Sequence, residues 1–283
     1  MTIRCATGGK PDLERSVDRI LERNAGKTIA IAFYDLRDGR TLLRNERTVF
    51  HAASMMKVPV MLGIFEAVTR GALRLDQPVL VRNDFISIYD GSHFQVDPKE
   101  DSDAEIYGLV GQQVPLELLV RHMIVRSSNL ATDNVIELIG AKSVMALMKR
   151  IGANDIQVLR GVEDQKAFDH GMNNTATAYD LMLIFRALGE RKVMSPDASQ
   201  RMIDILSGQE FNRGIPAGRP NGTLVAHKTG DITRGAHDGG LVFRPDGSSY
   251  VLVVMTKGFA TRKDADKVIA SISRAIWRST QSM

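Results

Sequence analysis

The chain has 283 residues, of which 43% are hydrophobic and 25% are charged, and its formal net charge is +4. This length can bury a sizeable core as one large domain or two interleaved ones, and no dense basic run indicates a nucleic-acid partner. Cys5 is the single cysteine, which excludes disulfides within the chain and a cysteine-based metal site; no apolar run approaches the roughly 20 residues that span a membrane.

The cellular compartment remains open. The N-terminal stretch MTIRCATGGKPDLERS lacks the apolar core of a secretory signal. This N-terminus is consistent with a cytoplasmic protein, and equally with a processed form to which a new methionine was added.

The first part of the chain predicts a helix followed by a hairpin. The helix starts near Pro11 and ends at Gly26, with an apolar stripe formed by Leu13, Val17, Ile20 and Leu21. Residues 28–34, TIAIAFY, predict a strand, and residues 41–43 return from a turn at Asp38-Gly39.

The stretch from Ser54 to about Thr69 predicts a buried helix, because apolar side chains cover most of its circumference. Its first turn nevertheless carries Ser54 and Lys57 on one face. The positive end of the helix dipole and the loss of water both lower the pKa of such a lysine, which makes it a usable base. Helix N–H groups can stabilise negative charge near the serine. The alternative is an ordinary serine cap with a lysine that reaches solvent, since Ser-x-x-Lys alone is common.

Residues 82–114 show little periodicity and contain several acids, among them Asp97, Glu100, Asp101, Asp103 and Glu105. The spacing and the central glycine of a calcium loop are missing. We therefore expect a solvated surface loop rather than a metal site.

The middle of the chain predicts a series of helices. One starts at Pro115, stops at Ser127-Ser128-Asn129 and resumes; others cover residues 142–151, 177–188 and 195–206, with an irregular segment at 156–174. A polar interruption between two apolar helical stretches suggests a turn that faces a cleft, although serine and asparagine can equally be helix caps.

Strands return at the end of the chain, at residues 223–228, 240–244 and 250–256, before a final helix at 263–279. The pattern predicts an α+β fold in which strands from both chain ends form an antiparallel sheet flanked by the terminal helices. We expect residues 1–53 and 207–283 to form the sheet domain, residues 54–206 an inserted helical domain, and the active site to lie in the cleft between them.

Three polar motifs follow one another at wide spacing: Ser54-x-x-Lys57, Ser127-Ser128-Asn129 and Lys228-Thr229-Gly230. In this set and order, the chain resembles the penicillin-recognising serine hydrolases, namely the class A β-lactamases and their D,D-peptidase relatives. The resemblance covers essentially the whole chain from about Leu13. It implies the β-lactamase/transpeptidase fold and an acyl-enzyme mechanism without a metal or cofactor.

The resemblance also implies roles for single residues. Ser54 matches the acylated nucleophile, Lys57 its general base, and Ser127 the serine that relays a proton to the leaving nitrogen. Substrate would be bound by Asn129 and by the strand edge at Lys228, Thr229 and Gly230, and the oxyanion by the backbone N–H groups of Ser54 and Asp231.

Two departures from the class A pattern concern the middle motif and the general base. Ser128 replaces the usual aspartate, which moves the motif toward the Ser-x-Asn of peptidases. The family's glutamate, two residues after an arginine, would fall on Val162 here. Glu163, one residue later in the loop opened by Arg160, is our candidate base for deacylation; the alternative is a surface acid paired with Arg160.

The leading hypothesis is a class A β-lactamase-like hydrolase that acts on β-lactams or on peptidoglycan-like acyl-D-Ala substrates. The close alternative is a D,D-peptidase or esterase that is acylated by β-lactams and deacylates slowly. A non-catalytic penicillin sensor is less favoured, since such sensors report across a membrane. We expect a monomer without nucleic-acid partner or membrane insertion; the family suggests the cell envelope or periplasm, whereas this chain shows no signal peptide.

Overall fold

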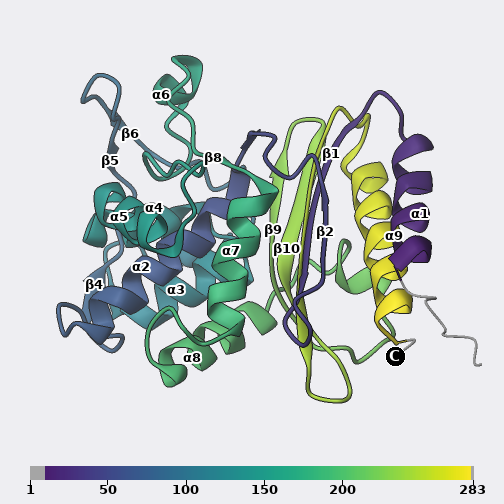
Figure 1. Cartoon of the computed structure of the whole chain (residues 1–283). Helices are drawn as coiled ribbons and strands as arrows, with labels where there is room; N and C mark the ends of the chain where they lie inside the picture. Colours follow the sequence, from purple (N-terminus) through teal and green to yellow (C-terminus); the bar gives the residue numbers. More distant parts are fainter. Residues whose placement is uncertain (1–9, 282–283) are drawn as a thin grey trace, which may run out of the picture.

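The structure, a computed structural model, describes residues 10–281, so Cys5 lies outside it. At its centre is a five-stranded antiparallel sheet with the strand order β2-β1-β11-β10-β9 (Figure 1). The strands are β1 (Thr28–Asp35), β2 (Thr41–Arg44), β9 (Val225–Ile232), β10 (Gly235–Phe243) and β11 (Ser249–Lys257). Strands from the start of the chain pair with strands from its end, which confirms the predicted α+β fold.

Both faces of the sheet are covered, so successive side chains of a strand enter two different cores. In β1, Ile31 and Phe33 pack with the helices α1 (Lys10–Glu22) and α9 (Arg262–Gln281), which lie side by side on one face (Figure 1). Ala30 and Ala32 point into the larger core on the opposite face. There α7 (Ala178–Gly189) packs directly against β1 and β11.

The segment between β2 and β9 is mainly helical and adds further elements to the second face. Its other helices are α2 (Lys57–Thr69), α3 (Leu116–Val125), α4 (Asn129–Ile139), α5 (Ala141–Ile151), α6 (Gln165–Asp169) and α8 (Pro196–Ser207). Short paired strands join them: β3 (Phe50–His51) with β8 (Thr175–Ala176), β4 (Pro78–Leu80) with β7 (Gln113–Pro115), and β5 (Phe85–Ile86) with β6 (His93–Phe94). The 3₁₀ segments are η1 (Ala53–Met56), η2 (Glu105–Leu109) and η3 (Pro216–Gly218). The division into sheet and helical domains at these boundaries stays a prediction.

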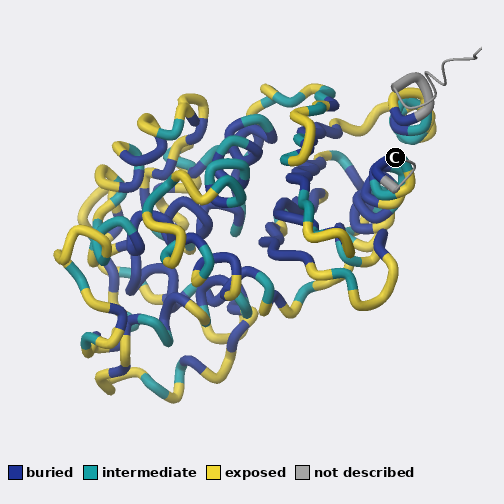
Figure 2. Tube along the Cα trace, turned by 60° about the horizontal axis from the view of Figure 1, so that its bottom comes forward, coloured by how far each residue is buried: buried dark blue, intermediate teal, exposed yellow. Residues whose placement is uncertain are grey.

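The expected central helix is buried. The 3₁₀ turn η1 carries Ser54, and α2 follows directly, with every residue from Lys57 to Phe65 buried. Pro59 has no N–H to donate, and the change from 3₁₀ to α geometry lies just before it. Helices α3, α4, α5 and α8 contact α2. Figure 2 shows buried chain running through the inner helices and the sheet, with exposed chain at the outer loops.

Two strand boundaries differ from the sequence-based prediction. Strand β9 continues to Ile232, so the motif at Lys228 lies inside the strand rather than at its end. Strand β10 begins at Gly235 instead of Gly240. Its glycines suit close packing, not a turn: a Cβ on Gly239 would lie 3.0 Å from the Met55 side chain, and one on Gly240 would lie 2.3 Å from the Ala226 carbonyl oxygen.

The expectation of a solvated acidic loop was wrong for two of its acids. Asp101 and Asp103 are 9% and 2% exposed. Buried carboxylates need hydrogen-bond partners, and here these come from α3 and α4, which are distant in sequence. None of the described helices has both the length and the apolar composition required to cross a membrane.

Candidate active site

Ser54 lies at a strained turn that faces a cleft. The preceding residue, Ala53, has φ of 46°, in the left-handed region that costs a non-glycine residue energy. The Ala53 N–H donates to Nδ1 of His51 at 3.0 Å, which holds this conformation. Ser54 is partly exposed and lines a cleft of about 410 Å³ together with Asn129, Glu163 and other residues.

Lys57 lies behind Ser54 with no solvent exposure. Its Nζ donates to the Ser127 carbonyl oxygen at 2.5 Å, to the Asn129 Oδ1 at 2.8 Å and to the Ser128 carbonyl oxygen at 3.3 Å. Burial lowers its pKa to about 8, against the opposing effect of nearby carboxylates. A lysine with this pKa can exchange a proton near neutral pH.

The Ser127 hydroxyl lies between two buried lysines. Ser127 has φ of 58°, and its Oγ accepts from Lys228 Nζ at 2.9 Å while Lys57 Nζ lies 3.4 Å away. Lys228 is also fully buried, and burial together with the charge of Lys57 holds its pKa well below the usual value. Two amines of lowered basicity around one hydroxyl form a path along which a proton can move.

Strand β9 approaches the Ser54 turn closely. A Cβ on Gly230 would lie 3.1 Å from Met55 Cγ and 3.3 Å from Met55 N, so glycine permits this distance. The next residue, Asp231, is paired with Arg262 at 2.6 Å and lines the cleft. The sequence motif therefore brings the edge of the sheet to the expected nucleophile.

Glu163 also lines the cleft, together with Asp231 of β9. Its φ of 57° is left-handed, and its Oε1 accepts from Asn129 Nδ2 at 2.8 Å. Glu163 is exposed at the cleft, yet desolvation by the cleft walls raises its pKa, and Lys57 opposes that effect. The neighbouring Val162 instead donates its N–H to Asp133 Oδ1 at 2.7 Å and packs against the core.

The loop that carries Glu163 is held by contacts other than an Arg160–Glu163 pair. Arg160 donates to the carbonyl oxygens of Met172 and Gly161 at 3.0 and 3.1 Å. Asp164 caps α6 and accepts from Ser87 Oγ at 2.8 Å, which ties the loop to the β5–β6 hairpin.

The structure thus gathers the sequence-predicted residues around one cleft and its floor. It adds residues that the sequence analysis did not assign to the site: His51 at the nucleophile turn, Arg262 beside Asp231, and the buried carboxylates Asp101 and Asp133. The partners of Asp101, Asp133 and Arg262 lie far away in sequence, so no local pattern indicated these three residues. In the described part of the chain, no cluster of three or more histidine, cysteine, aspartate or glutamate side chains is arranged to hold a metal ion.

Comparison with known proteins identifies the family. A family model described as the β-lactamase enzyme family matches residues 12–280. The chain belongs to the β-lactamase enzyme family. It is a serine hydrolase of the class A β-lactamase type, as its three motifs predict.

Two curated relatives of this β-lactamase-family enzyme come from Pseudomonas aeruginosa. The extended-spectrum β-lactamase PER-1 is 23% identical over 273 residues, covering 89% of this chain and 82% of PER-1. The β-lactamase VEB-1 is 22% identical over 291 residues, covering 98% of this chain and 93% of VEB-1.

Solved structures confirm the fold. The structure of PBP-A is 25% identical with a TM-score of 0.83, covering 97% of each chain. A β-lactamase from Sphaerobacter thermophilus is 24% identical with a TM-score of 0.80, covering 96% of this chain and 98% of that one.

Asp133 generates a prediction about stability. It is 2% exposed, its Oδ2 has no hydrogen-bond partner, and burial raises its pKa well above the usual value. An acid whose pKa is raised by folding contributes stability below its unfolded pKa and loses it as the pH rises through the folded pKa. Asp133→Asn keeps an acceptor for Val162 N–H without a titrating charge. We expect its melting temperature to exceed the parent's by about 2–4 °C at pH 8, with a smaller gain at pH 5.

Differential scanning calorimetry at the two pH values measures this effect. Asp97→Asn, which removes an exposed acid, is the control and should show no such pH-dependent gain. An Asp133→Asn protein that loses more stability at pH 8 than at pH 5 would contradict the assignment of a destabilising buried charge.

Proposed function

We propose that this enzyme hydrolyses β-lactam amide bonds through an acyl-enzyme on Ser54, with Lys57 as the base for acylation and Glu163 as the base for deacylation. The main support for this proposal is that Ser54, Asn129 and Glu163 line one cleft. The floor of this cleft holds Ser127 between two buried lysines. This arrangement provides a nucleophile, a base, a proton relay and a second base in separate positions.

In the acylation step, Ser54 Oγ bonds to the lactam carbonyl carbon as Lys57 takes the hydroxyl proton. The backbone N–H groups of Ser54 and Asp231 are our proposed oxyanion donors, supported by the close approach of Gly230 to Met55. The carbon–nitrogen bond then breaks, and Ser127 delivers the proton to the leaving nitrogen. Lys57 and Lys228 flank that hydroxyl at 3.4 and 2.9 Å.

In the deacylation step, a water molecule gives a proton to Glu163 and bonds to the ester carbonyl carbon. The ester bond to Ser54 Oγ breaks, and the proton returns to the serine. The left-handed conformation of Glu163 supports this role, because it directs the side chain toward Asn129 although Val162 occupies the family's usual position. A raised pKa suits a general base at neutral pH.

For substrate binding, we assign the acyl side chain to Asn129 and the carboxylate to the β9 edge at Lys228, Thr229 and Gly230. The relatives named as extended-spectrum β-lactamases support a β-lactam substrate. The acyl-enzyme complex of a PBP-A mutant with penicillin G, 24% identical to this chain, supports a shared fold for such chemistry. We propose a monomer, because every residue of the proposed mechanism comes from this one chain.

A D,D-peptidase or esterase acting on peptidoglycan-like acyl-D-Ala substrates is the second candidate. It is favoured by Val162 at the position of the family's glutamate and by Ser128 in the middle motif. Burst kinetics with nitrocefin separate the candidates: sustained turnover supports a β-lactamase, slow turnover after a burst supports the second candidate, and a single stoichiometric burst supports a penicillin sensor.

The nucleophile assignment predicts one covalent adduct. Incubation with a penicillin should add one acyl mass per protein, and Ser54→Ala should remove the adduct because the proposed mechanism places the acyl bond on Ser54 Oγ. Intact-protein mass spectrometry is the measurement, with Ser271→Ala on α9 as a control that should still acylate. An adduct of the same stoichiometry in Ser54→Ala would refute the assignment.

The base assignment predicts a trapped intermediate. Glu163→Gln keeps the size of the side chain and its contact with Asn129 but cannot take a proton from water. Turnover should therefore fall about 100-fold or more while acylation continues, so that the acyl-enzyme accumulates. Rapid quenching followed by mass spectrometry measures both steps.

Asp169→Asn is the matched control, since this exposed acid lies on the short helix α6 that follows Glu163, and its side chain accepts from Gln165 Nε2 at 2.7 Å. It should turn over like the parent. Parent-like turnover in Glu163→Gln would instead assign deacylation to another group and favour the peptidase or esterase reading.

A further inference from the structure

The Ser127–Asn129 turn is held between a buried ammonium and a buried carboxylate. On one side, the carbonyl oxygens of Ser127 and Ser128 accept from Lys57 Nζ at 2.5 and 3.3 Å. On the other side, the N–H groups of Asn129 and Leu130 donate to the Asp101 carboxylate at 3.0 and 2.9 Å. The peptide dipoles of the turn therefore lie between opposite charges, an arrangement that both charges stabilise.

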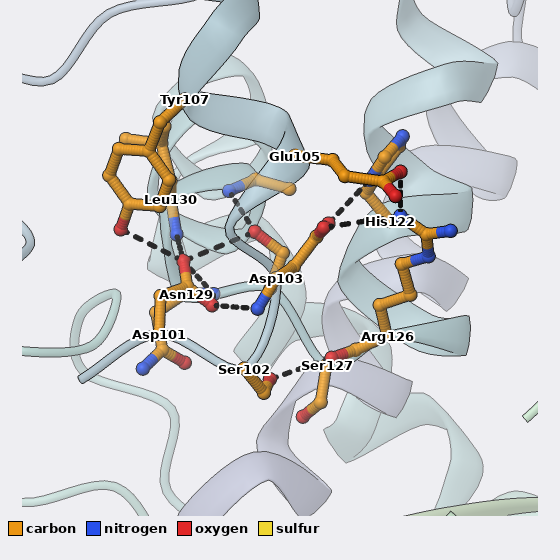
Figure 3. Close-up of polar contacts among 12 residues, drawn as sticks. Asp101, Ser102, Asp103, Glu105, Tyr107, His122, Arg126, Ser127, Asn129 and Leu130 are labelled. Atoms are coloured by element: carbon orange, nitrogen blue, oxygen red, sulfur yellow. Dashed lines mark hydrogen bonds and ion pairs between the residues drawn. The ribbon is translucent and has the colours of Figure 1, made fainter. Parts of the chain in front are cut away.

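Asp101 reaches this turn from the acidic loop, 28 residues earlier in the chain. Its carboxylate also accepts from Ser128 Oγ at 3.3 Å and from the Tyr107 hydroxyl at 3.0 Å. Figure 3 shows Tyr107, Asn129 and Leu130 gathered around Asp101. Asp101 as a whole is 9% exposed, so these donors replace most of the water around its carboxylate.

These contacts exceed what an ordinary helix cap needs. Helix α4 begins at Asn129, and Ser128 already caps it by accepting from Ala131 N–H at 3.1 Å. Asp101 takes the two N–H groups that precede Ala131, so that the whole first turn is held. The negative charge also lies at the positive end of the helix dipole.

The same turn carries the side chains of the proposed mechanism. Ser127 has a left-handed backbone and offers its hydroxyl to both lysines, and Asn129 Oδ1 and Nδ2 contact Lys57 and Glu163. A small displacement of the turn would therefore change several catalytic contacts at once. Class A relatives usually carry an aspartate where this chain has Ser128, and here a carboxylate approaches the motif from a separate loop.

We propose that Asp101 is a positioning residue of the reaction: it holds the Ser127–Asn129 turn in its reactive geometry and places a negative charge behind Lys57. This inference rests on the proposed acylation of Ser54.

The charged groups around Lys57 allow this role to be separated from mere support of the fold. Burial lowers the pKa of Lys57, whereas the carboxylates of Asp101, Asp133 and Glu163 oppose the shift, Asp101 most strongly. Lys228 is the positive neighbour. Removing the Asp101 charge should therefore lower the pKa of Lys57 further and move the acidic limb of the acylation rate to lower pH.

Asp103 offers a matched control in the same loop. Asp103 is 2% exposed, and its Oδ2 lies 2.5 Å from His122 Nδ1. It also pairs with Arg126, and Figure 3 shows both partners. Its carboxylate fastens the loop to α3 and does not accept from the amides of Asn129 or Leu130. Asp103→Asn should therefore weaken the loop and leave the charge behind Lys57 in place.

The test measures single-turnover acylation by a penicillin from pH 5 to pH 10 for the parent, Asp101→Asn and Asp103→Asn. In Asp101→Asn, we expect the plateau rate to fall about 10-fold or more and the acidic limb to move about one pH unit lower. Asp103→Asn should lose thermal stability, but the acidic limb of its acylation rate should stay at the pH of the parent. A parent-like profile in Asp101→Asn, or an equal shift in Asp103→Asn, would overturn the inference.

A rescue variant keeps the test decisive if Asp101→Asn is too unstable to purify. Asp101→Asn combined with Ser128→Asp returns a carboxylate to the motif, and it should acylate faster than Asp101→Asn alone and within about 3-fold of the parent. A folded double variant that fails to acylate would contradict the inference. If the parent protein forms no adduct on Ser54, the proposed function itself is refuted. If the parent acylates and Asp101→Asn has the same acylation rate and pH profile, only the role of Asp101 is refuted.

Discussion

The burial of Lys57 and Lys228 on either side of one hydroxyl is the constraint on which the site depends. Neither lysine has solvent exposure, and both reach Ser127 Oγ. Buried charge is costly unless partners replace water, so the protein must bring acceptors to each amine. Lys57 receives two backbone carbonyl oxygens and the Asn129 amide oxygen. The buried carboxylate of Asp101 is then understandable as a balancing charge near the same floor.

Backbone strain marks the same region. Among the described residues, six non-glycine residues have left-handed φ, and three of them, Ala53, Ser127 and Glu163, each stand at one part of the site. Such conformations persist only where neighbouring contacts hold them. His51 accepts from Ala53 N–H, Lys228 binds the Ser127 hydroxyl, and the Glu163 carboxylate accepts from the Asn129 amide. The strain therefore aims side chains into the cleft that a relaxed backbone would direct elsewhere.

Local sequence patterns were sufficient to predict the buried helix behind Ser54, the individual strands at both chain ends and the three motifs. Each of these features depends on residues close in sequence. The extent of β10 was missed because glycines that admit Met55 and the β9 backbone resemble turn residues. The burial of Asp101 was missed because its donors lie on α4. The position of Glu163 depends on the sign of one φ angle, which no residue type at that site reveals.

The central claim is that Lys57 is a base with a lowered pKa, and its titration tests this most directly. Lysine labelled with ¹³C at the ε position gives an NMR signal that moves as the amine loses its proton, and Lys57→Met assigns that signal by its disappearance. The account predicts a midpoint near pH 8, set by burial against the surrounding carboxylates. A midpoint close to 10.5, the ordinary value for lysine, would contradict it.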